Sequence, residues 1–147
     1  LSAGVHHLFH VVCPVVEGFH GLLQRRAEII RRYDAALQPL GVETLTHFGE
    51  DYRSSGHLYI TRVPNITEQQ RNDIIIKMAE REIACNVHYK PLPMMTAYKT
   101  LGFDIEDYPN AYKHYANEIT LPLHTKLSDE DVAYVIENFT EILKEYL

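Results

Sequence analysis

The sequence predicts an α+β fold, in which a small antiparallel or mixed sheet of about three strands packs with helices. The first observation is that segments with apolar residues at three- and four-residue spacing alternate with short runs rich in β-branched and aromatic residues. The second is length, because 147 residues are enough for one domain with its own core. No internal repeat or low-complexity linker interrupts the pattern.

The first predicted helix runs from about Gly21 to about Leu40, where Gly41 ends it. Arginines take one face, and the other face is apolar. The apolar positions are Leu23, Ala27, Ile30, Tyr33 or Asp34, and Leu37. Residues 1–20 show no sustained period, so we expect a poorly defined arm over 1–20 and a single domain over 21–147.

Three strands are predicted at residues 56–63, 83–89 and 119–124, and residues 42–46 could add a short one. In the second strand, Cys85, Val87 and Tyr89 alternate with Asn86 and His88. Prolines after residue 90 stop this strand. The sheet should therefore present polar groups on one face.

Four further helices are predicted. Thr67 and Gln70 form a capping box for a helix to about residue 81, and residues 94–101 and 109–119 give two more. Ser128 and Asp131 cap the last helix. Its apolar stripe consists of Val132, Val135, Ile136, Phe139, Ile142 and Leu143.

Composition excludes several functional classes. Twenty acidic and fourteen basic residues give a net charge of -6, which disfavours nucleic-acid binding. No apolar run approaches the roughly 20 residues that span a bilayer, and we find no signal peptide, so we expect no membrane partner. Cys13 and Cys85 lack metal-type spacing and are expected to be free thiols in a reducing cytoplasm.

Catalytic motifs of the common autonomous enzymes are absent from the sequence. There is no Gly-rich phosphate loop, no Gly-x-Ser-x-Gly elbow and no Cys/His nucleophile pair. His6, His7 and His10 could offer imidazoles to a metal, but no second ligand pair accompanies them, so we predict a solvated arm and no metal site. A metal-binding histidine protein remains a third possibility.

The candidate binding residues are His88 and Tyr89, which end a predicted strand just before a proline turn. They could form a pair of donors for an anionic or hydroxylated ligand. Alternatively, Tyr89 faces the core and His88 is an ordinary surface residue. His57, next to Gly56 at the start of a strand, is a weaker candidate that could equally be structural.

From about Leu22 to the C-terminus, the sequence resembles the C-terminal small domain of the DegT/DnrJ/StrS family, the pyridoxal-phosphate-dependent nucleotide-sugar aminotransferases. The order and spacing of the segments together are specific. In chain order they are the Arg-rich helix ending in Tyr-x-x-Ala-Leu at 33–37, Ser-Ser-Gly-His-Leu-Tyr at 54–59, His-Tyr-x-Pro-Leu at 88–92, Gly-Phe at 102–103, Asp-Tyr-Pro-Asn-Ala at 107–111, Leu-Pro-Leu-His at 121–124 and Leu-Ser-Asp-Glu-Asp-Val at 127–132. Residues 1–20 depart from the family pattern.

The resemblance implies a homodimeric fold type I aminotransferase that uses pyridoxal phosphate (PLP) to transfer an amino group to a nucleotide-linked keto sugar. The family places the Schiff-base lysine, and the acidic partner of the pyridine nitrogen, in its large domain. None of the six lysines here stands in that context, so we assign no catalytic residue; they are Lys77, Lys90, Lys99, Lys113, Lys126 and Lys144. The resemblance assigns sugar-nucleotide contact to His88 and Tyr89, and more weakly to His57.

The chain opens at Leu1 and is too short to include the large cofactor domain, so we expect a fragment that is inactive alone and binds no PLP. Its first helix would expose an apolar face, which predicts a homo-oligomer. The alternative function is a stand-alone binding or dimerisation module without catalysis.

Overall fold

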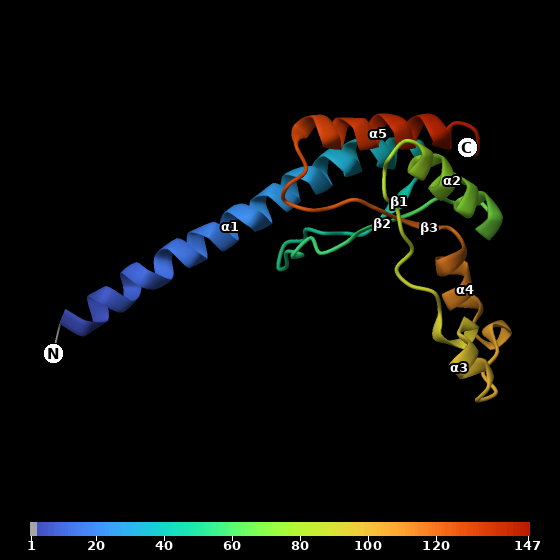
Figure 1. The fold of residues 1–147 in the computed structure, drawn as a ribbon, viewed down its shortest axis with the longest axis horizontal. Helices are drawn as coiled ribbons and strands as arrows, with labels where there is room; N and C mark the ends of the chain where they lie inside the picture. Colours follow the sequence, from blue (N-terminus) through green and yellow to red (C-terminus); the bar gives the residue numbers. More distant parts are fainter. Residues whose placement is uncertain (1–2) are drawn as a thin grey trace.

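The computed structural model describes the backbone of residues 3–147 and the side chains of residues 18–147. Figure 1 shows helices packed over a small sheet, which confirms the predicted α+β class. The helices are α1 (Ala3–Leu37), α2 (Glu68–Glu80), α3 (Thr96–Lys99), α4 (Pro109–Ala116) and α5 (Asp129–Leu143). The strands are β1 (Glu43–Thr44), β2 (Tyr59–Arg62) and β3 (Glu118–Leu121), and 3₁₀ turns are η1 (Gln38–Leu40), η2 (Leu92–Met94) and η3 (Ile105–Asp107).

The sheet is antiparallel, with β2 between β1 and β3. Because side chains alternate along a strand, the register separates two faces. One face carries Tyr59 and Thr61 from β2 and Ile119 and Leu121 from β3, all buried against α1, α2 and α5. The opposite face carries Ile60, Arg62, Glu118 and Thr120. Because the three helices pack against the first face, the second face is the one on which a binding site can form.

The predicted strand at residues 83–89 is wrong, because this segment makes only one bridge, between Asn86 and Thr120. The next two backbone donors turn to side chains: Val87 N–H donates to Asn86 Oδ1 at 2.8 Å and His88 N–H to Glu118 Oε2 at 2.9 Å. Such local bonds compete with a ladder. The third strand is instead β1, within the short segment that the sequence left open.

Helix α1 starts at Ala3, so the predicted start near Gly21 is wrong. Nucleation is the costly step of helix formation, and an established helix therefore extends over residues of weak preference. α1 itself ends at Leu37, and the 3₁₀ turn η1 continues it to Leu40. As predicted, Gly41 then ends the helical segment: it has φ +81° and donates its N–H to Gln38 O. The proposed division at residue 20 stays a prediction, and His6, His7 and His10 lie outside the described side chains.

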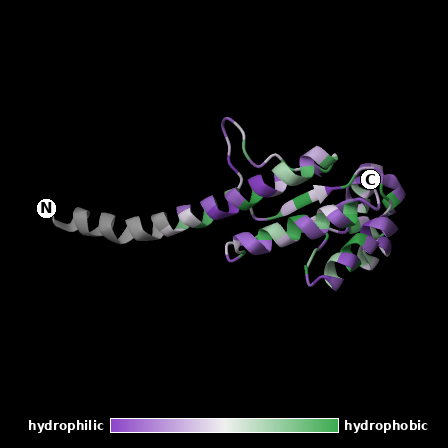
Figure 2. Ribbon diagram, turned by 90° about the horizontal axis from the view of Figure 1, so that it is seen from above, coloured by the Kyte–Doolittle hydropathy of each residue, from purple (hydrophilic) through white to green (hydrophobic). Residues whose placement is uncertain are grey.

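Both predicted capping boxes are confirmed. Thr67 accepts from the Gln70 N–H at 3.2 Å, and Ser128 accepts from the Asp131 N–H at 3.0 Å. The α5 stripe is confirmed as core, with Ile136 partly buried. Figure 2 shows both hydrophilic and hydrophobic residues along the described part of α1 and along α5, as expected for helices with one buried face.

Two smaller predictions need correction. The helix expected at 94–101 is the turn η2 followed by the four-residue α3. The helix expected at 109–119 ends at Ala116, because β3 begins at Glu118 and takes the last residues into the sheet. Within the described residues, no helix combines the length and apolarity needed to cross a bilayer.

Candidate functional site

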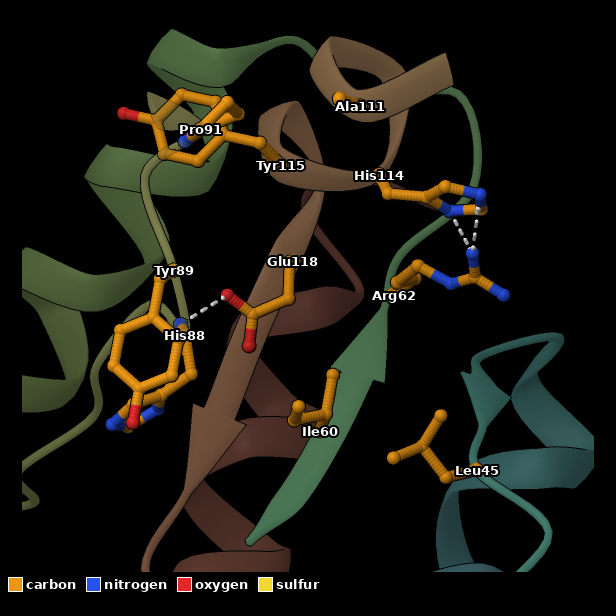
Figure 3. A pocket seen from close by; sticks show the side chains of 10 residues that line it. All are labelled: Leu45, Ile60, Arg62, His88, Tyr89, Pro91, Ala111, His114, Tyr115 and Glu118. Atoms are coloured by element: carbon orange, nitrogen blue, oxygen red, sulfur yellow. Dashed lines mark hydrogen bonds between the residues drawn. The ribbon is translucent and has the colours of Figure 1, made fainter. Parts of the chain in front are cut away.

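The outer face of the sheet forms the floor of an open hollow of about 400 Å³ (Figure 3). Ile60 and Arg62 of β2 and Glu118 of β3 supply this floor, and α4 borders it with Ala111, His114 and Tyr115. The segment leading to η2 provides the other wall. The lining residues from that segment are His88, Tyr89 and Pro91, and Leu45 completes the set.

His88 is held at its backbone and at its ring. Its N–H donates to Glu118 Oε2 at 2.9 Å, and its Nδ1 lies 3.0 Å from Thr120 Oγ1. Glu118 is 3% exposed and Thr120 5%, so these partners are fixed within the protein. The ring of His88 is half-buried as a result.

Tyr89 lies at the mouth of the hollow, with 71% of the residue exposed. Its ring packs edge-on against His88, with 4.7 Å between centroids. The alternative in which Tyr89 faces the core is therefore wrong. An exposed phenol beside a held imidazole offers a ligand both an apolar ring and a hydrogen-bonding hydroxyl.

Below the hollow, Arg71 of α2 supports the start of β3. It is 1% exposed and donates to the carbonyls of Tyr115 at 3.0 Å and Glu118 at 3.3 Å. Its guanidinium lies 4.7 Å from the Tyr115 ring centroid. Burial, then the hydrogen bond to Glu68, raises the pKa of the Tyr115 hydroxyl, which stays protonated at neutral pH.

The rim beside α4 is cationic. Arg62 forms an ion pair with Glu43 at 2.9 Å and also contacts the ring of His114. A neighbouring hollow of about 390 Å³ shares Arg62 and His114 and adds Lys113. This edge could accept an anionic group next to the apolar part of the hollow.

The structure brings together two of the three predicted site residues. His88 and Tyr89 line the same hollow, whereas His57 is exposed in the loop before β2 and does not line it. Sequence reasoning missed Arg62, His114 and Glu118. The alternation of Glu118 and Thr120 with Ile119 and Leu121 is a signal that could have revealed a polar face.

The hollow does not fit a covalently held PLP. A Schiff-base lysine is essential to that attachment, and no described lysine lines the hollow. Lys77 is bound to Glu145 at 2.6 Å, and Lys113 borders only the neighbouring hollow. The described residues also contain no group of three or more His, Cys, Asp or Glu side chains suited to a metal ion.

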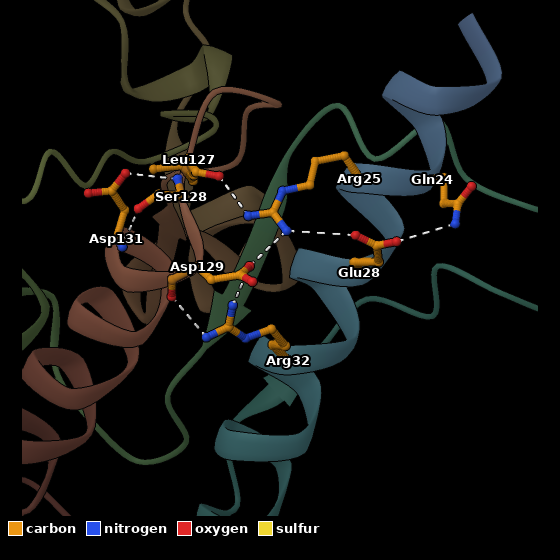
Figure 4. A network of polar contacts seen from close by, with 8 residues as sticks. All are labelled: Gln24, Arg25, Glu28, Arg32, Leu127, Ser128, Asp129 and Asp131. Atoms are coloured by element: carbon orange, nitrogen blue, oxygen red, sulfur yellow. Dashed lines mark hydrogen bonds and ion pairs between the residues drawn. The ribbon is translucent and has the colours of Figure 1, made fainter. Parts of the chain in front are cut away.

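A second polar network joins α1 to the start of α5 (Figure 4). Arg25 donates to Asp129 at 2.8 Å and to the Leu127 carbonyl at 2.7 Å, and Arg32 donates to Asp129 at 2.9 Å. The hydrogen bond from Arg25 is the main reason that the pKa of Asp129 is lowered. This network fixes the two helices relative to each other.

Residues 11–140 match the DegT/DnrJ/EryC1/StrS aminotransferase family. This chain belongs to that family. The predicted resemblance is thereby confirmed, since the match covers the Arg-rich helix, both walls of the hollow and most of α5. The polar face of the sheet described above is thus a feature of an aminotransferase-family domain.

Among relatives, the spore coat polysaccharide biosynthesis protein SpsC of Bacillus subtilis is 33% identical over 124 residues, which are 82% of this chain and 32% of SpsC. The UDP-4-amino-4,6-dideoxy-N-acetyl-beta-L-altrosamine transaminase of Campylobacter jejuni is 26% identical over 84% of this chain and 32% of its own length. This family chain therefore spans about a third of the length of the curated relatives it matches.

The fold is that of a solved relative. Spr1654 of Streptococcus pneumoniae, assigned as a sugar aminotransferase, superposes in its apo form with a TM-score of 0.84 and 52% identity, over 88% of this chain and 33% of Spr1654. A PLP form of the same protein gives a TM-score of 0.82. The family chain therefore shares its architecture with one third of a protein that has been solved with PLP.

Proposed function

We propose that this chain is the small, substrate-contacting domain of a PLP-dependent aminotransferase that acts on a nucleotide-linked keto sugar in the cytoplasm. The observation that supports it is the pairing of His88 and Tyr89 over the polar face of the sheet in a chain of this family. Relatives that act on a UDP-linked amino sugar support the substrate class.

In this proposal the chain's own residues bind and orient the sugar nucleotide. Tyr89 covers one side of the sugar and offers its hydroxyl, and His88 supplies a fixed polar contact. Arg62 and Lys113 place positive charge at the rim, where a phosphate would sit. Chemistry at the amino group is assigned to a large domain, because the hollow itself offers no lysine among its described residues.

A chimera tests the proposal. The corresponding third of Spr1654 is replaced by this chain, which 52% identity makes compatible. We expect the chimera to bind PLP and to transaminate a UDP-linked keto sugar. His88→Gln and Tyr89→Phe should lower kcat/KM by about tenfold or more, on the scale of one lost polar contact at a site.

His57→Gln is the matched control, because His57 is exposed and does not line the hollow. It should leave kcat/KM within about twofold. The proposal is refuted if the chimera binds PLP and turns over substrate while His88→Gln and Tyr89→Phe behave like His57→Gln.

The chain alone should not form an aldimine with PLP. After the two are mixed, reduced with borohydride and dialysed, the protein should retain no pyridoxyl absorbance. Covalent incorporation at any of the lysines would contradict the assignment of the cofactor to another domain.

A second candidate is a binding or dimerisation module without catalysis, favoured by exposed apolar residues on α1. Phe19 is 59% exposed and Leu22 51%. Under this alternative, calorimetry of the chain with a UDP-sugar gives tight binding, whereas a detached half-site binds weakly. We propose self-association through α1 in either case; light scattering of the chain and of Phe19→Glu measures it.

A further inference from the structure

The His88 ring belongs to a relay of buried and part-buried hydrogen bonds that links His88, Thr120 and Glu118 in a definite direction. Thr120 Oγ1 donates to Glu118 Oε1 at 2.5 Å, and His88 Nδ1 lies 3.0 Å from the same hydroxyl oxygen. The other carboxylate oxygen of Glu118 accepts the His88 backbone N–H at 2.9 Å. One carboxylate therefore holds both the main chain and the ring of His88.

The number of protons in this relay determines the tautomer of His88. An ionised Glu118 can only accept, and a threonine hydroxyl carries a single proton. Because that proton points to Glu118, the Thr120 oxygen has only lone pairs left for the imidazole. In the neutral ring, Nδ1 must therefore carry the hydrogen, and Nε2 must carry the lone pair.

Nε2 is the atom that remains for a ligand. It makes no hydrogen bond with the described residues, and it does not appear among their buried unpaired polar atoms. His88 itself lines the hollow. The sequence led us to expect a donor at this position, whereas the relay makes neutral His88 an acceptor.

We propose that Thr120 and Glu118 are positioning residues that fix neutral His88 as the Nδ1–H tautomer, so that Nε2 accepts a hydrogen bond from a hydroxyl or N–H of the bound sugar. The ligand contact rests on the function proposed above, but the tautomer does not. The relay thus selects a donor-bearing sugar group at Nε2 and disfavours an anionic oxygen there.

The test is a long-range ¹H–¹⁵N NMR spectrum of the ligand-free chain at about pH 8, where each imidazole nitrogen reports whether it carries a proton. The His88 signals are identified by their loss in His88→Gln. We expect a protonated Nδ1 and an unprotonated Nε2. A protonated Nε2 in the wild-type chain overturns the proposal without any ligand present.

Two variants separate the relay from simple packing. Thr120→Ser keeps the hydroxyl and should retain the Nδ1–H tautomer. In Glu118→Gln the side-chain amide oxygen can still accept the His88 backbone N–H. The NH₂ group of the amide then faces Thr120 and donates to its hydroxyl oxygen, so the Thr120 hydroxyl proton is free to be donated to His88 Nδ1. The tautomer should then switch to Nε2–H, and an unchanged tautomer in a folded Glu118→Gln would count against the relay.

A functional readout follows in the Spr1654 chimera. Glu118→Gln should raise KM for the sugar nucleotide by about tenfold with a smaller effect on kcat, since the acceptor at Nε2 is replaced by a donor. Thr120→Ser, which keeps the hydroxyl, should leave KM at the wild-type value. Equal KM values for the two variants would overturn the proposed role of the tautomer, whereas an inactive wild-type chimera would instead refute the proposed function and leave the NMR result standing.

Discussion

Replacing Arg71 by methionine should destabilise the protein strongly, although Arg71 lies on a helix whose neighbouring residues are mostly polar. The arginine is 1% exposed and donates to two main-chain carbonyls, at 3.0 Å to Tyr115 and 3.3 Å to Glu118. Hydrogen bonds to charged groups contribute about 1.5–3 kcal/mol each, which gives roughly 3–6 kcal/mol for the pair. Methionine retains much of the buried apolar stem but none of these bonds.

Two effects reduce this sum. Removing the charge recovers part of its desolvation cost. Glu68, the ion-pair partner at 3.6 Å, is 30% exposed and keeps hydrogen bonds from two tyrosine hydroxyls, so it is not left buried and unpaired. We therefore expect a net loss of about 3 kcal/mol, at the lower end of the range for breaking a buried pair.

Urea denaturation followed by circular dichroism measures the loss. With a slope of about 1–3 kcal/mol per molar urea, the midpoint should fall by roughly 1–3 M. Arg53→Met is the matched control. The Arg53 side chain is exposed and lies 6.0 Å from the Phe48 ring centroid, and its backbone bridge to Phe48 is kept in the variant, so the change should stay within about 0.5 kcal/mol. Equal midpoints for the two variants would refute the view that Arg71 supports β3.

Three further outcomes are expected. Because the pKa of Asp129 is lowered in the folded protein, its contribution to stability is complete above about pH 4, the ordinary pKa of an aspartate, and is lost as pH falls through the folded-state pKa. An NMR titration should place that folded-state pKa below 3.8. Asp129→Asn should reduce the loss of stability at acid pH. Burial raises the pKa of Cys85 to about 12. In a Cys13→Ser background, the Cys85 thiol of the folded protein should therefore react with a disulfide reagent at pH 8 far more slowly than the same thiol in urea. Equal rates would show that the thiol is accessible in the folded protein. Thr67→Ala removes the cap of α2 and should cost about 1 kcal/mol in urea unfolding, with Thr67→Ser close to wild type.

Local chemistry made several elements predictable. The capping boxes at Thr67 and Ser128 act within one helical turn, so their residues specify the helix starts without help from the rest of the chain. The α5 stripe and β2 follow from the side-chain periods of 3.6 and 2 residues. The sequence also located His88 and Tyr89 correctly before a proline turn, although it could not show what lies opposite them.

Charged residues mark where sequence reasoning failed. On α2 the buried apolar residues Ile74 and Met78 are accompanied by Arg71, which is also buried although it is charged. A period measures hydrophobicity, and it cannot register that two distant carbonyls and a tyrosine ring will surround a guanidinium. The same holds for Glu118, which is buried because residues 86–88 lie across it.

By itself, therefore, the sequence determined the helix boundaries that are capped locally, the buried stripes, the α+β class and the family. Only the tertiary structure decided that residues 83–89 leave the sheet, that His57 stays apart from His88 and Tyr89, and that Glu118 and Thr120 orient the His88 ring. The physical reason is range: caps and periods act over a few neighbouring residues, whereas Glu118 stands 30 positions from His88 and meets it only once β3 is in place.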